Sequence, residues 1–188
     1  MARVKPVFRP ADHPGTANAE TREALAELFA FLAPNASEPE IDKAHSGMAI
    51  AAQNPRLALH LARLTTFIAL QTSWSRRPEL VELAVQAVNL HFRSAFSFEA
   101  RLPRAESSGL GLNRLAAIPY WRTSRLFDAE QSLVLEYVEA VVSGEVPESL
   151  FAAIRDTYGE PAVVELTTLI GCFSMWAMLI NATAPELG

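Results

Sequence analysis

The strongest constraint on the fold is the spacing of apolar residues, which repeats with the period of an α-helix along most of the chain. Near the N-terminus, Leu25, Leu28 and Leu32 follow the i, i+3, i+7 pattern that gathers apolar side chains on one helix face. Leu57, Leu61, Leu64 and Ile68 are predicted to form the apolar stripe of a later helix. No segment shows the sustained alternation of apolar and polar residues that is typical of a half-buried strand between hairpin turns. The sequence therefore predicts an all-α protein with essentially no β-sheet.

Proline, glycine and capping residues indicate where these helices begin and end. Proline fits the first helical position because its missing N–H needs no partner there, as in the pair Asn54-Pro55. Asp128 with Gln131 matches a capping box, and Gly144 suits a helix stop. After a first helix that Pro34 closes, we expect helices over about 39–52, 54–68, 78–92, 94–106 (ended early or kinked by Pro103), 112–118, 128–143, 147–158 and 161–182. The short turns between them predict a bundle of about eight to nine helices.

The domain organisation follows from length and from proline placement. Residues 1–17 contain Pro6, Pro10 and Pro14, which block a helix and predict an extended arm. A length of 188 residues is ample for one domain and short for two, so residues 18–188 are predicted to form a single domain.

Composition narrows the range of partners and compartments. The net charge of −5 argues against a nucleic-acid-binding protein, which normally carries a basic face. Cys172 is the sole cysteine, which suits a reducing cytoplasmic environment, and residues 1–12 lack the apolar core of a secretory signal. The uncharged stretch from Leu166 to Ile180 is shorter than the roughly 20 residues that span a bilayer. We therefore interpret it as a buried core helix or a subunit-interface helix.

No standard motif for a phosphate loop, a zinc site, a nucleophile elbow or a dinucleotide is present, and we expect no metal and no cofactor. What remains is the predicted helix 78–92, which carries the polar stripe Glu79, Glu82, Gln86, Asn89 and Arg93 beside an apolar face that includes His91. The stripe is either a solvated surface or a face on which Glu82 looks into an enclosed pocket as a general acid or base. His91 is either a core histidine or a proton donor, and the pattern leaves both questions open.

The segment from Val81 to Phe98 resembles the signature of the carboxymuconolactone decarboxylase family, which includes the alkylhydroperoxidase-D-like proteins. Registered on Glu82, the two cysteine positions of the family fall on Ser94 and Ser97. The family's aromatic, tryptophan and histidine positions fall on Phe96, Phe98 and Arg101. The segments 127–144 and 163–182 are similar to the family's C-terminal half, so the resemblance covers about residues 48–182. It implies the all-α fold of this family and an assembly of several identical subunits.

The two serines are the main departure from that family. Its peroxidases work through a dithiol, and a serine hydroxyl cannot pass through the sulfenic acid and disulfide states. Ser94 and Ser97 therefore argue against a thiol peroxidase. Cys172 lies in the most apolar predicted helix, where a thiolate is disfavoured, so we interpret it as a structural cysteine.

Decarboxylation or hydration of a lactone or a ring-cleavage acid needs no thiol, and this is the function that we predict. Glu82 is the expected acid–base group with His91, Ser94 and Ser97 beside it, while Arg101, with Phe96 and Phe98, is expected to bind an anionic small molecule. Arg101 and Arg104 could equally be surface arginines. Two alternatives stay open: a redox protein of the alkylhydroperoxidase-D-like kind, and a non-catalytic member that keeps the fold for binding or assembly. The expected partners are a small molecule and further copies of the chain, with no nucleic acid and no membrane.

Overall fold

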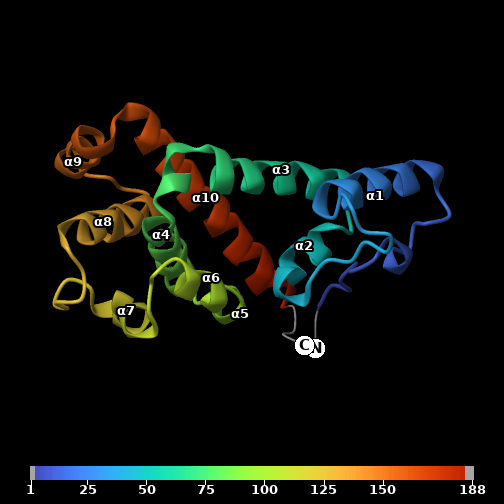
Figure 1. Cartoon of the computed structure of the whole chain (residues 1–188), viewed down its shortest axis with the longest axis horizontal. Helices are drawn as coiled ribbons and strands as arrows, with labels where there is room; N and C mark the ends of the chain where they lie inside the picture. The colour runs from blue at the N-terminus through green and yellow to red at the C-terminus, as the bar shows by residue number, and fades with distance from the viewer. Residues whose placement is uncertain (1–2, 185–188) are drawn as a thin grey trace. The chain divides into compact units, whose positions relative to one another are not determined.

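The computed structural model describes residues 3–184, and all regular secondary structure in this part of the chain is helical, with no strand (Figure 1). Its α-helices are α1 (Ala19–Leu32), α2 (Ser46–Ala51), α3 (Pro55–Gln71), α4 (Pro78–His91), α5 (Ala95–Ala100), α6 (Leu102–Ser107), α7 (Leu112–Ala117), α8 (Ala129–Ser143), α9 (Glu148–Tyr158) and α10 (Glu160–Thr183). Four short 3-10 helices are η1 (Pro10–Asp12), η2 (Lys43–His45), η3 (Ser73–Arg76) and η4 (Ile118–Tyr120). The predicted all-α class is confirmed. Met1 and Ala2 of the predicted arm and residues 185–188 of the predicted domain lie outside the described residues.

The local signals for helix ends agree with the structure. The side-chain oxygen of Asn54 accepts a hydrogen bond from the Leu57 N–H, just before Pro55 opens α3. Asp128 and Gln131 form the predicted capping box of α8. Gly144 ends that helix in the left-handed region, at φ 84°, which a residue with a Cβ adopts with strain. These ends are encoded within a few neighbouring residues, and for that reason they can be read from sequence.

Two helices differ in their bounds from the prediction. A distant segment of the chain changes the first, and a proline divides the second. The helix expected over 39–52 begins as an α-helix only at Ser46, since the Ile41 N–H donates to the Phe8 carbonyl instead of joining a helix. The helix expected over 94–106 is interrupted, as we predicted from Pro103: it forms two helices, α5 and α6, separated at Arg101, with Pro103 in the first turn of α6. In a continuous helix the Pro103 ring would clash with the preceding turn.

Backbone contacts divide the chain into two compact units, residues 1–66 with 179–188 and residues 67–178. The single domain that we expected for 18–188 therefore holds two groups of contacts. In the first unit, the N-terminal segment has bends and a turn besides η1, and it is fastened to α2 because the Val7 N–H donates to the Ala49 carbonyl at 2.8 Å. Val7 itself is fully buried. The predicted arm is thus part of the core of this unit.

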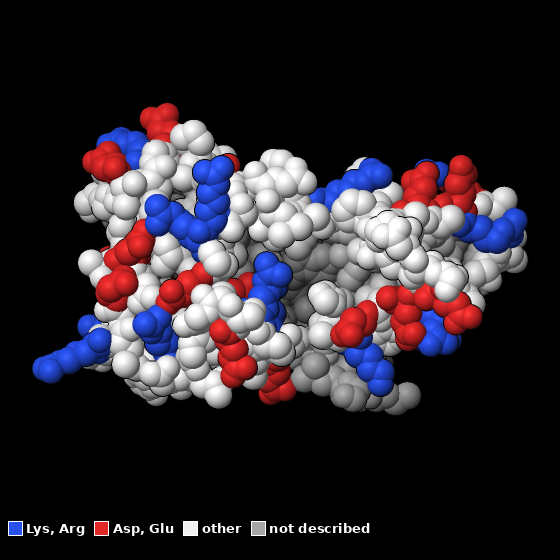
Figure 2. All heavy atoms as spheres, in the orientation of Figure 1, with Lys and Arg blue, Asp and Glu red and all other residues white. Residues whose placement is uncertain are grey.

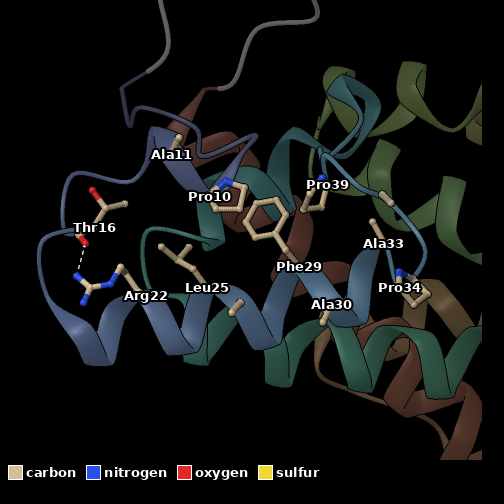
Figure 3. A pocket seen from close by; sticks show the side chains of 12 residues that line it. Pro10, Ala11, Thr16, Arg22, Leu25, Phe29, Ala30, Ala33, Pro34 and Pro39 are labelled. Carbon is tan, nitrogen blue, oxygen red and sulfur yellow. Dashed lines mark hydrogen bonds between the residues drawn. The ribbon is translucent and has the colours of Figure 1, made fainter.

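A cavity of about 540 Å³ lies in the first unit against one face of α1. Figure 3 shows Leu25 and Phe29 of α1 on one side of it, with Pro10 and Pro39 on the other. Arg22 lies at one end, where its Nη1 donates to the carbonyls of Thr16 and Ala17 at 2.8 Å each. The walls are otherwise mostly apolar.

In the second unit, α4 is the central element. Every residue from Leu80 to Asn89 is buried, and α4 packs against α8, α5 and α6. Polar contacts join the ends of these helices: Glu79 accepts hydrogen bonds from Arg114 and from Gln131, the latter at 2.8 Å. A helix that is covered on all sides holds its polar residues away from water, and this matters for the site below.

The apolar stripe that we predicted for α3 is wrong at two of its four positions. Of the predicted positions, Ile68 is buried and Leu61 is half-buried, whereas Leu57 and Leu64 are exposed. The buried face carries the smaller residues Ala58 and Ala62 with Leu59. Two leucines on a solvent-facing helix surface form an apolar strip without cover in the described chain.

The last helix is the one element long and apolar enough to cross a membrane by length and composition, among the described residues. Its most apolar window has a mean hydropathy of 1.8, and half of that window is buried inside the structure. The core helix of a soluble protein meets the same criteria.

On the face in Figure 2, Lys and Arg side chains are interspersed with Asp and Glu.

Candidate functional site

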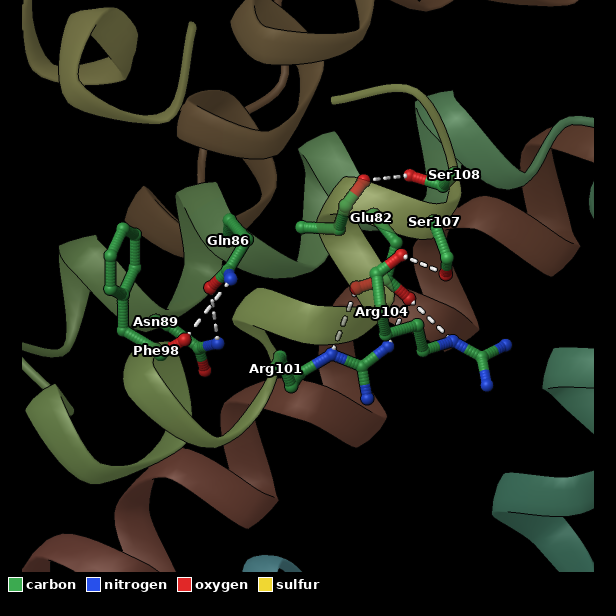
Figure 4. Close-up of polar contacts among 9 residues, drawn as sticks. Glu82, Gln86, Asn89, Phe98, Arg101, Arg104, Ser107 and Ser108 are labelled. Atoms are coloured by element: carbon green, nitrogen blue, oxygen red, sulfur yellow. Dashed lines mark hydrogen bonds and ion pairs between the residues drawn. The ribbon is translucent and has the colours of Figure 1, made fainter. Parts of the chain in front are cut away.

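The polar stripe predicted on α4 is buried along its middle. Glu82, Gln86 and Asn89 follow at i, i+4 and i+7 on one face, and each is at most 1% exposed. Short helices α5 and α6 lie against this face (Figure 4). The interpretation of this part of the stripe as a solvated surface is therefore wrong. Buried polar groups need hydrogen-bond partners, and the α5–α6 segment supplies them.

Glu82 lies between two arginines. Arg101, at the junction of α5 and α6, donates from Nε to Oε2 at 3.1 Å and from Nη2 to Oε1, a two-pronged arrangement. Arg104, one turn further on, donates from Nε to Oε1 at 2.8 Å. Figure 4 shows both guanidinium groups converging on the one carboxylate. Two cations around one anion leave a local excess of one positive charge.

The two arginines differ in their contact with water. The Arg101 side chain is 23% exposed and its guanidinium lies over the Phe173 ring of α10, 4.8 Å from the ring centre. The Arg104 side chain is 53% exposed, and among the described residues its Nη1 and Nη2 have no hydrogen-bond partner. Glu82 is thus inward-facing, as the predicted role requires, and one guanidinium edge next to it remains open to an incoming anion. Glu82 lines neither the cavity beside α1 nor a second cavity between η3 and the end of α9.

Gln86 and Asn89 continue the row of polar contacts. Gln86 donates from Nε2 to the Phe98 carbonyl of α5 at 3.2 Å, and Asn89 donates from Nδ2 to Gln86 Oε1 at 3.0 Å. The pair therefore fastens α5 to α4 through the backbone of Phe98. Phe98 and Phe96 are both half-buried.

Ser94 and Ser97, the two serines that we predicted beside Glu82, are brought into contact with each other. Both are buried, and the Ser94 hydroxyl donates to Ser97 Oγ at 2.8 Å. Ser94 is the residue just before α5, and the chain reaches it through Arg93 in the left-handed region, at φ 53°. This turn brings the side chains of Ser94 and Ser97, which are three positions apart in the sequence, into contact.

His91 does not join this group. It is exposed in the last turn of α4, where its ring makes an edge contact with Phe92 at 4.9 Å between ring centres. The interpretation of His91 as a core histidine is therefore wrong. His91 lies beyond the buried part of α4, which ends at Asn89.

Arg104, Gln86 and Asn89 are site residues that our predicted set left out. The signal for Arg104 was its position three residues after Arg101, which puts both on one side of a helix turn. Cys172 is buried in α10, as expected for a structural cysteine. Within residues 3–184, no group of three or more His, Cys, Asp or Glu side chains is placed to hold a metal ion.

Part of the chain is similar to a protein of Escherichia coli (strain K12), YnjA, whose description is "uncharacterized protein". The two are 36% identical over 80 residues, which make up 42% of this chain and 43% of YnjA. The chain thus spans less than half the length of this relative. No family model matches the chain, and no solved structure matches it.

Proposed function

We propose that the protein is a carboxymuconolactone decarboxylase-like enzyme, a lyase or hydratase that acts on a small carboxylated compound by acid–base chemistry. The observation that carries the proposal is the buried Glu82 carboxylate held by Arg101 and Arg104. These are an acid–base group and a carboxylate-binding cation within contact of each other. The proposal also rests on the resemblance that places Glu82 and Arg101 at two of the family's functional positions.

The open edge of Arg104 gives the substrate a place to bind. A substrate carboxylate can accept from Nη1 and Nη2 of Arg104, drawn by the excess positive charge of the group. Competition for the guanidinium groups would loosen the Glu82 contacts and free a carboxylate oxygen to take a proton from the substrate. In this role Glu82 acts first as a base, because it accepts hydrogen bonds from both arginines. Ser94 and Ser97 form a separate pair of hydroxyl groups beyond the C-terminal end of α4.

The test is turnover of carboxymuconolactone and related ring-cleavage acids, followed by ultraviolet absorbance and by release of carbon dioxide. We expect Glu82→Gln to lower kcat about 100-fold or more, the usual effect of losing a positioned acid–base group. Arg104→Gln should mainly raise KM. Arg125→Gln removes an equal charge from an exposed loop position and serves as the matched control. No turnover across the panel, or an unchanged rate in Glu82→Gln, would contradict the proposal.

A non-catalytic member of the family is the second candidate. It is favoured by the satisfied hydrogen bonds of the site, since no buried side-chain N or O atom in the described chain lacks a partner. In that case Glu82→Gln lowers stability while no substrate is turned over by the wild type. The redox alternative is tested in the same experiment by hydroperoxide consumption that disappears in Cys172→Ser.

We also propose that the chain forms a homo-oligomer and works in the cytoplasm. The exposed Leu57 and Leu64 on α3 support self-association, because a strip of leucine in water is a common site of subunit contact. The single cysteine supports a reducing compartment.

A further inference from the structure

A second surface cavity lies in the unit formed by residues 67–178, and none of its lining residues belongs to the Glu82 site. It has a volume of about 820 Å³ and opens between the end of α3, the 3-10 helix η3, Tyr158 at the end of α9 and Ala162 near the start of α10. Ligand pockets in proteins have volumes of about 300–1,000 Å³. The cavity is therefore large enough for a metabolite of several functional groups.

The charged residues that line this cavity are both cationic. Arg77 donates from Nη1 to Glu130 at 2.5 Å, and its guanidinium lies over the Tyr158 ring at 5.1 Å. Arg76 is exposed, and within the described residues its guanidinium has no hydrogen bond or ion pair. Arg77 is therefore a fixed part of the wall, while all five N–H groups of Arg76 are available to an anion.

The hydroxyl groups in the wall present acceptors. Thr72 donates to the Ile68 carbonyl at 2.8 Å, and Ser75 donates to the Thr72 carbonyl at 2.8 Å. Ser73 donates to the Glu165 carboxylate at 2.5 Å. Each hydroxyl proton is already committed, so what these three side chains can offer a ligand is an oxygen lone pair. A ligand that suits them must bring its own hydroxyl groups.

The aromatic part of the wall is rigid. Trp74 is buried, and its indole N–H donates to the Ala162 carbonyl at 2.7 Å. The Tyr158 ring packs on Trp74 with ring centres 4.8 Å apart, and Tyr158 donates its own hydroxyl to Glu130 at 3.0 Å. Tyr158 can therefore contribute a fixed ring face but no free hydroxyl proton.

From these contacts we propose that the cavity binds a polyhydroxylated anion, a sugar phosphate or a sugar acid. The anionic group pairs with the Arg76 guanidinium, and the ligand's hydroxyl groups donate to the oxygens of Ser73 and Ser75. Neither the anionic group nor the hydroxyl groups of the ligand are sufficient alone. The Arg76 guanidinium pairs with a negative charge, and the side-chain oxygens of Ser73 and Ser75 accept only from a ligand that donates hydrogen bonds.

Isothermal titration calorimetry on the full chain tests this with glucose 6-phosphate, gluconate, glucose and inorganic phosphate. We expect one of the two charged sugars to bind at least tenfold more tightly than both glucose and inorganic phosphate. Which of the two charged sugars binds distinguishes a phosphate from a carboxylate as the recognised group. Arg76→Gln should weaken that binding at least tenfold, whereas Arg125→Gln, an equal loss of exposed charge, should leave it unchanged.

Three results would overturn the inference: no binding of either charged sugar at millimolar concentration, equal binding of inorganic phosphate, or an equal loss of affinity in both arginine variants. Circular dichroism of each variant verifies that it is folded. Since Arg76 is exposed and its side chain makes no hydrogen bond or ion pair within the described residues, its substitution should leave the helical signal unchanged.

Discussion

At the scale of single residues, the buried carboxylate of Glu82 is the feature with the largest consequences. Moving a charge out of water is costly, and the group remains charged in a protein interior when opposite charges and hydrogen bonds surround it. Arg101 and Arg104 supply those contacts from a different part of the chain. The three side chains are not equivalent, because they differ in their access to water.

This difference predicts an order of stability losses. Arg101→Met should lower the free energy of unfolding by about 3–5 kcal/mol, since it leaves a carboxylate that is 1% exposed with Arg104 alone. Glu82→Gln should cost about 1–3 kcal/mol, because both arginines can still reach water. Arg104→Met should cost about 1 kcal/mol or less, since the Arg104 side chain is 53% exposed. Urea unfolding measures all three, and equal losses in the series would contradict this account of the site.

The serine pair gives a second prediction at this scale. Ser94 and Ser97 hold their side-chain oxygens 2.8 Å apart, so cysteines at both positions should form a disulfide without moving the backbone. The double variant Ser94→Cys with Ser97→Cys should lose about 2 Da on mild oxidation, the two hydrogens of a new disulfide. Each single variant is the control, since neither has a partner thiol at that place. Two thiols that stay reduced would show that the side chains do not approach as described.

At the scale of helices, backbone conformation predicts that replacing glycine by alanine has opposite effects on stability at two positions. Gly144 ends α8 at φ 84°, whereas Gly171 lies inside α10, where an added Cβ meets nothing within 4 Å. Gly144→Ala should therefore destabilise the protein by about 1 kcal/mol, and Gly171→Ala should stabilise it by about 0.5–1 kcal/mol. Thermal unfolding of the two variants measures the signs. A rise in Tm for Gly144→Ala would show that the α8 end does not depend on the left-handed conformation.

At the scale of the whole molecule, exposed leucine predicts self-association. We expect the wild type to sediment as a dimer or larger oligomer, and Leu57→Glu with Leu64→Glu to shift it towards monomer by placing charges in the contact. Leu112→Glu on α7, at a leucine that is exposed to a similar degree, is the matched control. A monomeric wild type at micromolar concentration would refute the homo-oligomer.

The helical class, most helix ends and the polar stripe that carries Glu82, Gln86 and Asn89 on one helix were predictable from sequence. Helical period, proline at a first turn and glycine at a last turn are local, and they depend on a few neighbouring residues. The same is true of the Asp128 capping box. The α3 stripe and the start of α2 were not predictable, because distant segments decide which face is covered and whether Ile41 pairs with Phe8.

By itself, then, the sequence determined that this chain is a set of helices and that α4, one of its most apolar helices, carries a polar stripe. The tertiary structure alone decided that this stripe is inside, that Arg101 and Arg104 close on Glu82, and that His91 stays in water. The physical reason is that periodicity fixes which side chains share a helix face, whereas burial and charge pairing depend on what packs against that face.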